Sequence, residues 1–234
     1  MVEIIQGVHQ VDGVNGNSYL VLENDGSLTL IDTGMSTGGK KILDYVRTNL
    51  KKQPSDVKTI VITHSHLDHT RGALAIKKAT GAKVAIHELD ADYLSGKKKL
   101  PPPKGAMGLL FRIFGVFFRI PTVEPEMRLK ENDRIGSLTV LHTPGHTPGS
   151  ISLYNQERKL IFVGDAITNR EGKISGSPKR FNFDLQQANK SIEKISTVDF
   201  EVLLSGHGEP VKSGGTQKVR ELSSSLNKQQ ISQK

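Results

Sequence analysis

Residues 64–69 read His-Ser-His-Leu-Asp-His and carry side chains suited to binding a metal ion. Three of the chain's eight histidines fall within these six positions, directly after the apolar run at residues 58–62. A short β-branched run of this kind predicts a buried strand, so we expect the cluster in the loop at that strand's carboxyl end. Imidazole and carboxylate groups at this spacing suit zinc, iron, manganese or cobalt.

Three later stretches each place a histidine or an aspartate after an apolar run. His146 lies in a turn rich in proline and glycine, at residues 143–150. Asp165 and His207 each follow a strand-like run and stand directly beside glycine. Glycine at such positions lets the backbone come close to an ion. Four strand ends that all carry ligand side chains indicate one composite metal site.

With these motifs in this order, the chain resembles the metallo-β-lactamase superfamily from about residue 2 to about residue 210, nearest to its glyoxalase II and lactonase-like branch. The resemblance covers the following metal ligands: His64, His66, Asp68, His69, His146, Asp165 and His207. Asp32, in the Leu-Ile-Asp-Thr-Gly stretch, matches the family's first motif, whose aspartate orients a ligand. The resemblance implies an α+β fold, a four-layer αββα sandwich of two mixed β-sheets flanked by helices, with the metals along one edge.

Seven ligands exceed what one tetrahedral ion uses, which favours two divalent ions that share a bridge. By family resemblance, the first ion is held by His64, His66 and His146, the second by Asp68, His69 and His207, and Asp165 bridges them. The ions are expected to be zinc, although the same donors also suit iron or manganese. Asp68 and Asp165 are the predicted catalytic residues, with Asp68 passing a proton to the leaving group.

This arrangement predicts a metal-dependent hydrolase in which a hydroxide bridging the metals cleaves a small ester, thioester or lactone. Only a short polar tail follows His207, which differs from the helical glutathione-binding domain of glyoxalase II-like enzymes. Residues 166–206 contain no tyrosine, although related lactonases place one there. The alternative is a phosphodiesterase or nuclease with the same metals.

Composition bounds the remaining possibilities. The net charge is +8, but the lysines are spread along the chain, so nucleic acid is not an expected partner. Zero cysteines exclude disulfides and thiolate sites. Residues 34–41 nearly match a phosphate-binding loop but end in Lys41 where a hydroxyl is needed, and no serine-hydrolase elbow occurs. With no visible secretion signal and no apolar run of about 20 residues, we expect a cytoplasmic protein without stable membrane insertion.

The expected elements can be given by their residue ranges. The chain is expected to open with a hairpin at residues 18–22 and 27–31, and a strand is predicted at 83–86. Helices are predicted at residues 36–50, at 72–80 with Gly81 after it, and at 184–195 with Asp184 as N-cap. Residues 1–212 are expected to form one domain, followed by a polar, partly helical tail at 213–234.

An apolar helical insertion is predicted near residues 96–121. Four of the eight phenylalanines lie within residues 105–120. We expect this segment to form a wall or lid over the metals, which would give the substrate an apolar acyl part. Core packing, a homodimer interface and a membrane-surface helix are the alternatives. Of the other histidines, His9 is expected to be structural or exposed, His142 to pack or to support a ligand, and His87 either to line the pocket or to cap a helix.

Overall fold

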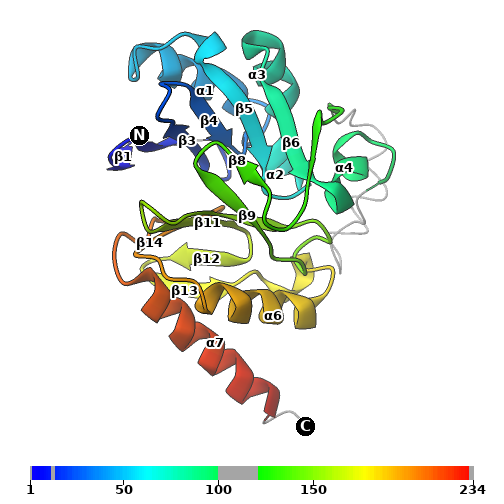
Figure 1. Ribbon diagram of the computed structural model, residues 1–234. Helices are drawn as coiled ribbons and strands as arrows, with labels where there is room; N and C mark the ends of the chain where they lie inside the picture. The colour runs from blue at the N-terminus through cyan, green and yellow to red at the C-terminus, as the bar shows by residue number, and fades with distance from the viewer. Residues whose placement is uncertain (1, 12–13, 100–120, 232–234) are drawn as a thin grey trace.

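The computed structural model describes residues 2–11, 14–99 and 121–231. Two mixed β-sheets lie face to face between helices (Figure 1). The seven-stranded sheet keeps the order of the sequence: β1 (Val2–Ile5), β2 (Val8–Val11), β3 (Ser18–Leu22), β4 (Leu28–Ile31), β5 (Val57–Ile62), β6 (Lys83–His87) and β7 (Met127–Leu129). The five-stranded sheet is ordered β14 (Val202–Ser205), β11 (Leu160–Gly164), β10 (Ile151–Asn155), β9 (Leu138–His142) and β8 (Arg134–Ile135). A small third sheet pairs β12 (Ile167–Arg170) with β13 (Lys173–Gly176).

Helices cover the outer faces of the two large sheets. Those after the early strands are α1 (Gly38–Thr48), η1 (Pro54–Asp56), α2 (Leu67–Thr70), α3 (Ala73–Thr80) and α4 (Glu88–Leu94). Those of the second half are η3 (Lys179–Phe181), α6 (Leu185–Ser196) and α7 (Gly215–Ile231). Figure 1 shows α1 and α3 above the first sheet, and α6 and α7 below the second. The predicted four-layer αββα sandwich is therefore confirmed.

The period of two along the central strands explains the layers. On β5, Ile60 and Ile62 pack among the residues of α1 and α3, whereas Val61 faces the second sheet. On β11, Phe162 faces the first sheet, whereas Ile161 packs among residues of α6 and α7. Successive side chains of a strand point to opposite faces, so a strand buried on both faces reads as a continuous apolar run.

Parallel strand pairs bring the metal-binding loops to one edge. In the first sheet β4, β5 and β6 are parallel neighbours, and in the second sheet β11 and β14 are. Two hydrogen bonds join the sheets at this edge: Ile151 N–H donates to the Thr63 carbonyl at 3.0 Å, and the Tyr19 hydroxyl donates to the Ser205 carbonyl at 2.7 Å. The two halves of the chain are therefore fixed relative to each other where the ligands emerge.

Several predicted elements are confirmed, and others were missed. The β3–β4 hairpin, α1, α3 and β6 lie where the sequence placed them. Gly81 has the left-handed φ of +72° that ends α3, and the Asp184 carboxylate accepts the Gln187 N–H at 3.0 Å as the cap of α6. The prediction that the chain opens with the β3–β4 hairpin was wrong, since β1 and β2 precede it. The hairpin of β12 and β13 and helices α2 and α4 were also missed.

The ends of the predicted domain need separate mention. Residues of the expected polar tail form α7, where Val219 is buried and Leu222 and Leu226 pack against the same core cluster. The insertion predicted near residues 96–121 lies largely outside the described residues, so its role as a wall, core, interface or membrane-surface helix stays a prediction. The domain boundaries likewise stay a prediction.

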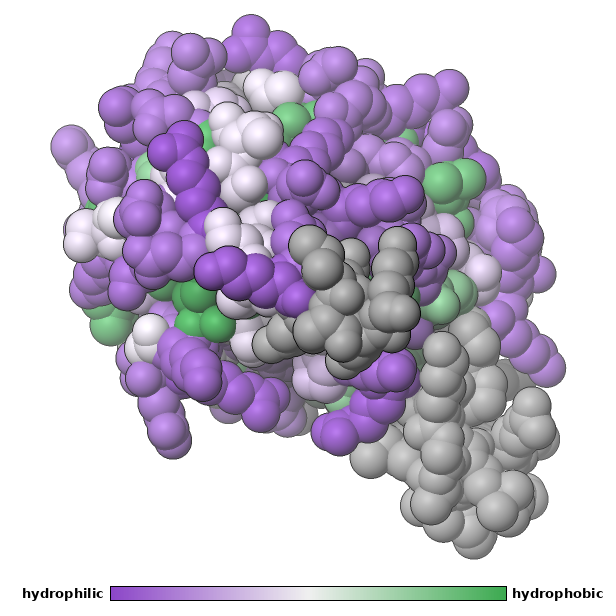
Figure 2. Space-filling view, turned by 90° about the horizontal axis from the view of Figure 1, so that it is seen from below, coloured by the Kyte–Doolittle hydropathy of each residue, from purple (hydrophilic) through white to green (hydrophobic). Residues whose placement is uncertain are grey.

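The described surface is largely polar on the face seen from below. Figure 2 shows hydrophilic residues over most of this face, with hydrophobic residues in small separate groups. Within residues 2–11, 14–99 and 121–231, none of the helices combines the length and the apolarity needed to cross a bilayer.

Candidate metal centre

The loop after β5 brings four of the seven predicted ligands together. His66 has an extended backbone and is the N-cap residue of α2, so the chain reverses into a helical turn directly after it. This reversal brings His69 back beside His64, with ring centroids 4.1 Å apart. The ring of His66 lies 5.0 Å from that of His64. A strand end followed by one short helix is thus enough to bring the histidine side chains of this motif together.

The other three ligands come from the second sheet. His146 lies in the turn between β9 and β10, and its ring centroid is 4.5 Å from that of His66. Asp165 and His207 follow the neighbouring parallel strands β11 and β14, and the ring of His207 lies 5.4 Å from that of His69. All seven predicted ligands therefore meet between the two sheets.

The ligand atoms fall into three overlapping groups, each with its atoms within 4.8 Å of one another. The groups are His64, His66 and His146; Asp68, His69 and His207; and His64, His69 and Asp165. We call the first the three-histidine group and the second the mixed group. Nε2 of His64 and Nε2 of His146 lie 3.2 Å apart. Two nitrogens bound to one tetrahedral zinc ion stand about 3.3 Å apart, so this spacing suits a shared ion.

Asp165 lies between the three-histidine group and the mixed group. Its Oδ2 is 3.6 Å from Nε2 of His146 and 3.5 Å from Nε2 of His207, one histidine from each group. Its Oδ1 is 3.4 Å from Nε2 of His69. A carboxylate with one oxygen between two sets of imidazoles has the placement that a bridging ligand needs.

Two buried atoms at the centre have no hydrogen-bond partner among the described residues: Nε2 of His69 and Oδ1 of Asp165. Buried polar atoms in native proteins are normally paired, and with Nδ1–H of His69 given to Asp32 its Nε2 is a lone pair, so two unpaired electron-pair atoms at one point call for a missing partner. Imidazole nitrogens and carboxylate oxygens are donors that zinc, iron and manganese accept. The residues present therefore fit divalent metal.

Asp32 holds His69 from outside the ligand set, as the resemblance implied. Its Oδ2 accepts the Nδ1–H of His69 at 2.8 Å, and the two carboxylate oxygens accept the Thr63 N–H and hydroxyl at 2.8 and 2.7 Å. A carboxylate on one ring nitrogen fixes the tautomer and turns the other nitrogen toward a metal. Asp32 has a φ of +57°, a left-handed conformation that is uncommon outside glycine and typical of functional sites.

His146 is held in the same way by neutral groups. Its Nδ1 lies 3.0 Å from the Ser177 hydroxyl and 3.2 Å from Oδ1 of Asn182. The Asn182 amide in turn donates to the Ser177 carbonyl at 3.1 Å. These contacts place the segment between β13 and α6 against the three-histidine group and direct Nε2 of His146 inward.

Asp90, which sequence reasoning missed, connects two metal-binding loops. This buried carboxylate on α4 accepts the N–H of Ser65 at 2.8 Å, between His64 and His66. It also accepts the Thr147 hydroxyl and the Gly149 N–H, each at 2.7 Å, in the turn that carries His146. Its partners are far away in the sequence, so nothing in the local pattern distinguished Asp90 from an exposed helix residue.

The two groups differ in electrostatics. In the three-histidine group, burial followed by neighbouring imidazoles lowers the pKa of His64 well below its usual value and that of His66 to about 3. Burial also lowers the pKa of His146. In the mixed group, burial would lower the pKa of His69, but the charges of Asp32 and Asp165 raise it well above its usual value. The hydrogen bond from His207 to Asp68 raises the pKa of His207.

Close backbone approach explains the glycine beside His207. A Cβ added to Gly206 would meet Oδ1 of Asp165 and Cε1 of His69. The loop is also held by the residue before β3, because the Asn17 side-chain amide donates to the carbonyls of Ser205 and Gly208 at 2.9 and 2.8 Å. Gly206 and Asn17 thus allow the loop that carries His207 to lie close to the metal centre.

The remaining histidines lie outside the three groups. His87 accepts the Leu89 N–H through Nδ1 and caps α4, so the capping alternative is confirmed. Its ring stacks on His142 with centroids 4.0 Å apart, and Nε2 of His142 lies 2.9 Å from the Pro148 carbonyl oxygen, which confirms a packing role for His142. His9 places Nδ1 3.1 Å from the Tyr45 hydroxyl.

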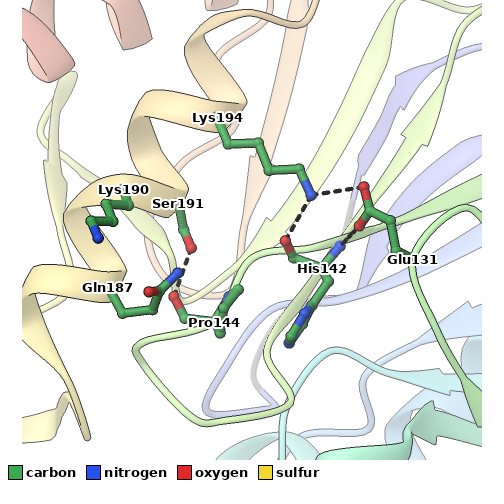
Figure 3. Close-up of a pocket in the computed structure, with 7 residues that line it drawn as sticks. All are labelled: Glu131, His142, Pro144, Gln187, Lys190, Ser191 and Lys194. Carbon is green, nitrogen blue, oxygen red and sulfur yellow. Dashed lines mark hydrogen bonds and ion pairs between the residues drawn. The ribbon is translucent and has the colours of Figure 1, made fainter.

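A cavity of about 360 Å³ lies behind the His146 turn, between that turn and α6 (Figure 3). Its wall includes His142 and Pro144, and the Lys194 ammonium donates there to the Glu131 carboxylate and the His142 carbonyl. None of the seven ligands lines it. This cavity is therefore separate from the metal centre.

Comparison with known proteins agrees with the site. The family model described as the metallo-beta-lactamase superfamily matches residues 11–207. The chain is 29% identical to the probable metallo-hydrolase YflN of Bacillus subtilis, over 89% of this chain and 86% of that protein. It is 30% identical to the acyl-coenzyme A thioesterase MBLAC2 of Gallus gallus, over 66% of this chain and 58% of that protein.

Solved structures share the fold. BJP-1, a subclass B3 metallo-beta-lactamase of Bradyrhizobium japonicum, superposes with a TM-score of 0.70 at 26% identity, covering 99% of this chain and 94% of that one. TTHA1623 in a di-iron-bound form superposes with a TM-score of 0.68 at 26% identity, covering 90% and 96%. Together with the ligand geometry, these matches show that the chain belongs to the metallo-beta-lactamase superfamily, as a metal-dependent hydrolase.

Proposed function

We propose that this protein is a dinuclear hydrolase that cleaves a small ester, thioester or lactone. The observation that carries the proposal is the position of Asp165, whose Oδ2 lies between His146 and His207 while Oδ1 is buried and unpaired. One carboxylate shared by two ligand groups is the arrangement that holds two ions close together. A mononuclear site would need no such shared ligand.

The ligand assignment follows the three groups. We assign His64, His66 and His146 to one ion, Asp68, His69 and His207 to the other, and Asp165 to both. We expect zinc, and the same donors accept iron or manganese; TTHA1623 is a relative of this fold that was solved with two irons. When bound, two such ions supply Lewis acidity and lower the pKa of water toward neutrality.

Side chains of the protein orient the metal ligands and transfer a proton. Asp32, Ser177 and Asn182 hold ligand imidazoles in one orientation. The side chain of Asp68 is 38% exposed, whereas that of Asp165 is 10% exposed, so Asp68 is the carboxylate that a leaving group can reach. We assign to Asp68 the transfer of a proton to the leaving group, with His207 as the hydrogen-bond partner of its Oδ2 at 3.1 Å.

The substrate class rests on the same site and on one relative. MBLAC2 is named as an acyl-coenzyme A thioesterase, which supports keeping thioesters among the candidates. An apolar acyl part of the substrate is proposed with it. A homodimer, a cytoplasmic location and the absence of nucleic-acid binding remain predictions.

Metal analysis followed by a hydrolysis screen tests this function. Protein purified without added metal is first assayed for zinc, iron and manganese, and we expect two ions per chain. The same sample is then given acetyl esters, a thioester, a lactone and a bis-aryl phosphodiester, with chelator-treated and zinc-restored protein as controls. We expect carboxylic substrates to have the higher kcat/KM. A preference for the phosphodiester would establish the alternative function instead.

A further inference from the structure

Tyr93 lies next to the loop that carries His64 and His66. It follows Asp90 by three residues on α4, so the two side chains share one face of that helix. Asp90 hydrogen-bonds directly to Ser65, between the two histidines. Because the face of α4 is fixed on the metal-binding loop by Asp90, Tyr93 stands one helical turn further along the same surface.

Phe183 approaches the same place from the other sheet. Its N–H donates to the His146 carbonyl at 3.2 Å, while the side chain of its neighbour Asn182 contacts the His146 ring. The rings of Tyr93 and Phe183 meet edge to face, with centroids 6.2 Å apart. In Figure 1, α4 belongs to the upper half and the start of α6 to the lower half, on the same side of the molecule. The aromatic pair thus spans the two halves beside the three-histidine group.

The pair is accessible, and exposed apolar side chains lie close to both rings in the sequence. Both rings are half-buried, which leaves part of each free to contact another molecule. Among the described residues, the exposed large hydrophobic side chains are Val2, Leu89 and Leu185. Leu89 precedes Tyr93 by four residues on α4, and Leu185 follows Phe183 by two. Partly exposed rings on the two elements that hold the metal-binding loops, with exposed leucines on the same elements, indicate a contact surface for an apolar ligand.

We propose that Tyr93 and Phe183 bind the apolar acyl chain of the substrate while its carbonyl lies at the metal centre. This rests on the proposed hydrolase function and narrows it to esters or thioesters whose acyl group is a medium-length alkyl chain or an aromatic ring. The pair belongs to the two elements that are hydrogen-bonded to the loops of His66 and His146, so it accommodates the part of the substrate on that side of the scissile bond.

Chain-length kinetics of the metal-loaded enzyme give the first test. The variants Tyr93→Ala and Phe183→Ala are compared with wild type on p-nitrophenyl acetate and octanoate. Loss of one ring contact is expected to lower kcat/KM for octanoate about tenfold and for acetate less than about twofold. Tyr93→Phe, which keeps the ring, should restore the octanoate rate. Phe181→Ala is the matched control, since the Phe181 ring is instead covered by the Arg180 guanidinium at 4.7 Å.

A binding measurement separates this inference from the hydrolase function. The chain contains no tryptophan, so Phe183→Trp introduces a single fluorescent reporter, and Phe181→Trp is its control. Titration with octanoate should shift the emission of the Phe183→Trp variant at concentrations where acetate does not, and should leave the control unchanged.

The outcomes are distinct. Equal losses on acetate and octanoate in the alanine variants, or an octanoate response that is the same for reporters at positions 183 and 181, would overturn the proposed acyl contact. The wild-type protein could instead cleave none of the carboxylic substrates while the Phe183→Trp variant still responds selectively to octanoate. That result would contradict the proposed reaction but support the apolar binding surface.

Discussion

The two ligand groups of the metal centre lie on either side of Asp165 but differ in exposure and charge. In the three-histidine group His64 and His146 are almost fully buried and His66 is half-buried, whereas in the mixed group His69 is buried and the side chains of Asp68 and His207 are 38% and 29% exposed. Burial keeps the first set of imidazoles neutral, and neutral imidazole is the form that binds metal. In the mixed group, carboxylates raise the histidine pKa values, so protons compete for the same nitrogens. The comparison separates a protected ion position from one that is open to solvent and substrate.

Removal of Asp165, the ligand that we assign to both groups, should have the largest effect on activity and metal content. Asp165→Ala is expected to lower activity about 100- to 1,000-fold and to reduce metal content together with it, because both groups lose one ligand. Metal analysis and kcat/KM on one ester check this. A variant that retains two ions per chain would contradict the bridging assignment.

Acid should remove the two ions in sequence. Protonation competes with metal binding below the pKa of a ligand, so the raised pKa values of His69 and His207 predict that the mixed group loses its ion first as the pH falls. The three-histidine group should hold its ion to lower pH, since the pKa of His66 lies at about 3. Zinc retained after dialysis at stepped pH values measures the order.

Single-ligand variants give the control for this experiment. His207→Ala should hold about one ion, released at the lower pH, and His66→Ala should hold about one ion, released at the higher pH. Release of the ion from His66→Ala at the lower pH would show that the electrostatic contrast does not govern metal affinity.

Asp90 should support the three-histidine group selectively. Asp90→Asn places an amide N–H where the carboxylate now accepts from Ser65, Thr147 or Gly149, so at least one hydrogen bond is lost. We expect the affinity for the first ion to fall about 10- to 100-fold and that for the second to change little. Competition with a chromogenic chelator measures both.

The matched control for Asp90 is Asp92→Asn. Asp92 lies on the same helix, but its carboxylate faces Arg128 and Lys98 at the surface. Its replacement should leave both metal affinities unchanged. Equal losses in the two variants would reduce the effect of Asp90 to general destabilisation of α4.

The smallest expected effect concerns histidines outside both groups. Burial, followed by the His142 charge, lowers the pKa of His87 to about 4 from its usual value near 6.5. Between these values the unfolded chain binds the extra proton, so His87 should reduce stability as the pH falls from 6.5 to about 4 and no further below that. His87→Asn keeps an acceptor for the Leu89 N–H without titrating. Urea unfolding of both metal-free proteins at several pH values should show wild type losing stability relative to the variant, and parallel curves would contradict this.

Much of this site was predictable because ligand residues are clustered in sequence or marked by neighbouring glycine. His64, His66, Asp68 and His69 lie in one loop, and the apolar run of β5 places that loop at a sheet edge. The contacts of Asp90 could not be predicted, since its partners are 25 to 59 residues away and depend on how α4 lies against two turns. The β12–β13 hairpin was missed because its strands are short and largely polar.

The contact between Tyr93 and Phe183 could not be predicted from the sequence either. Phe183 was visible in the sequence as one of three phenylalanines between Asp165 and His207, but nothing in the chain connected it with Tyr93. Their meeting depends on the packing of the two halves, which brings together residues 90 positions apart. Local patterns thus indicated which side chains come together at the site, whereas tertiary packing decides what surrounds them.

Each ligand group draws side chains from both large sheets, as His64 with His146 and Asp68 with His207 illustrate. Bound ions therefore act as removable cross-links between the two halves of the chain. By mass action, free metal at about 100 times its dissociation constant adds about 2.7 kcal/mol to the free energy of unfolding for each independent site. The thermal midpoint of this protein should consequently follow the metal concentration of its surroundings, so that metal starvation lowers the amount of folded protein as well as its activity.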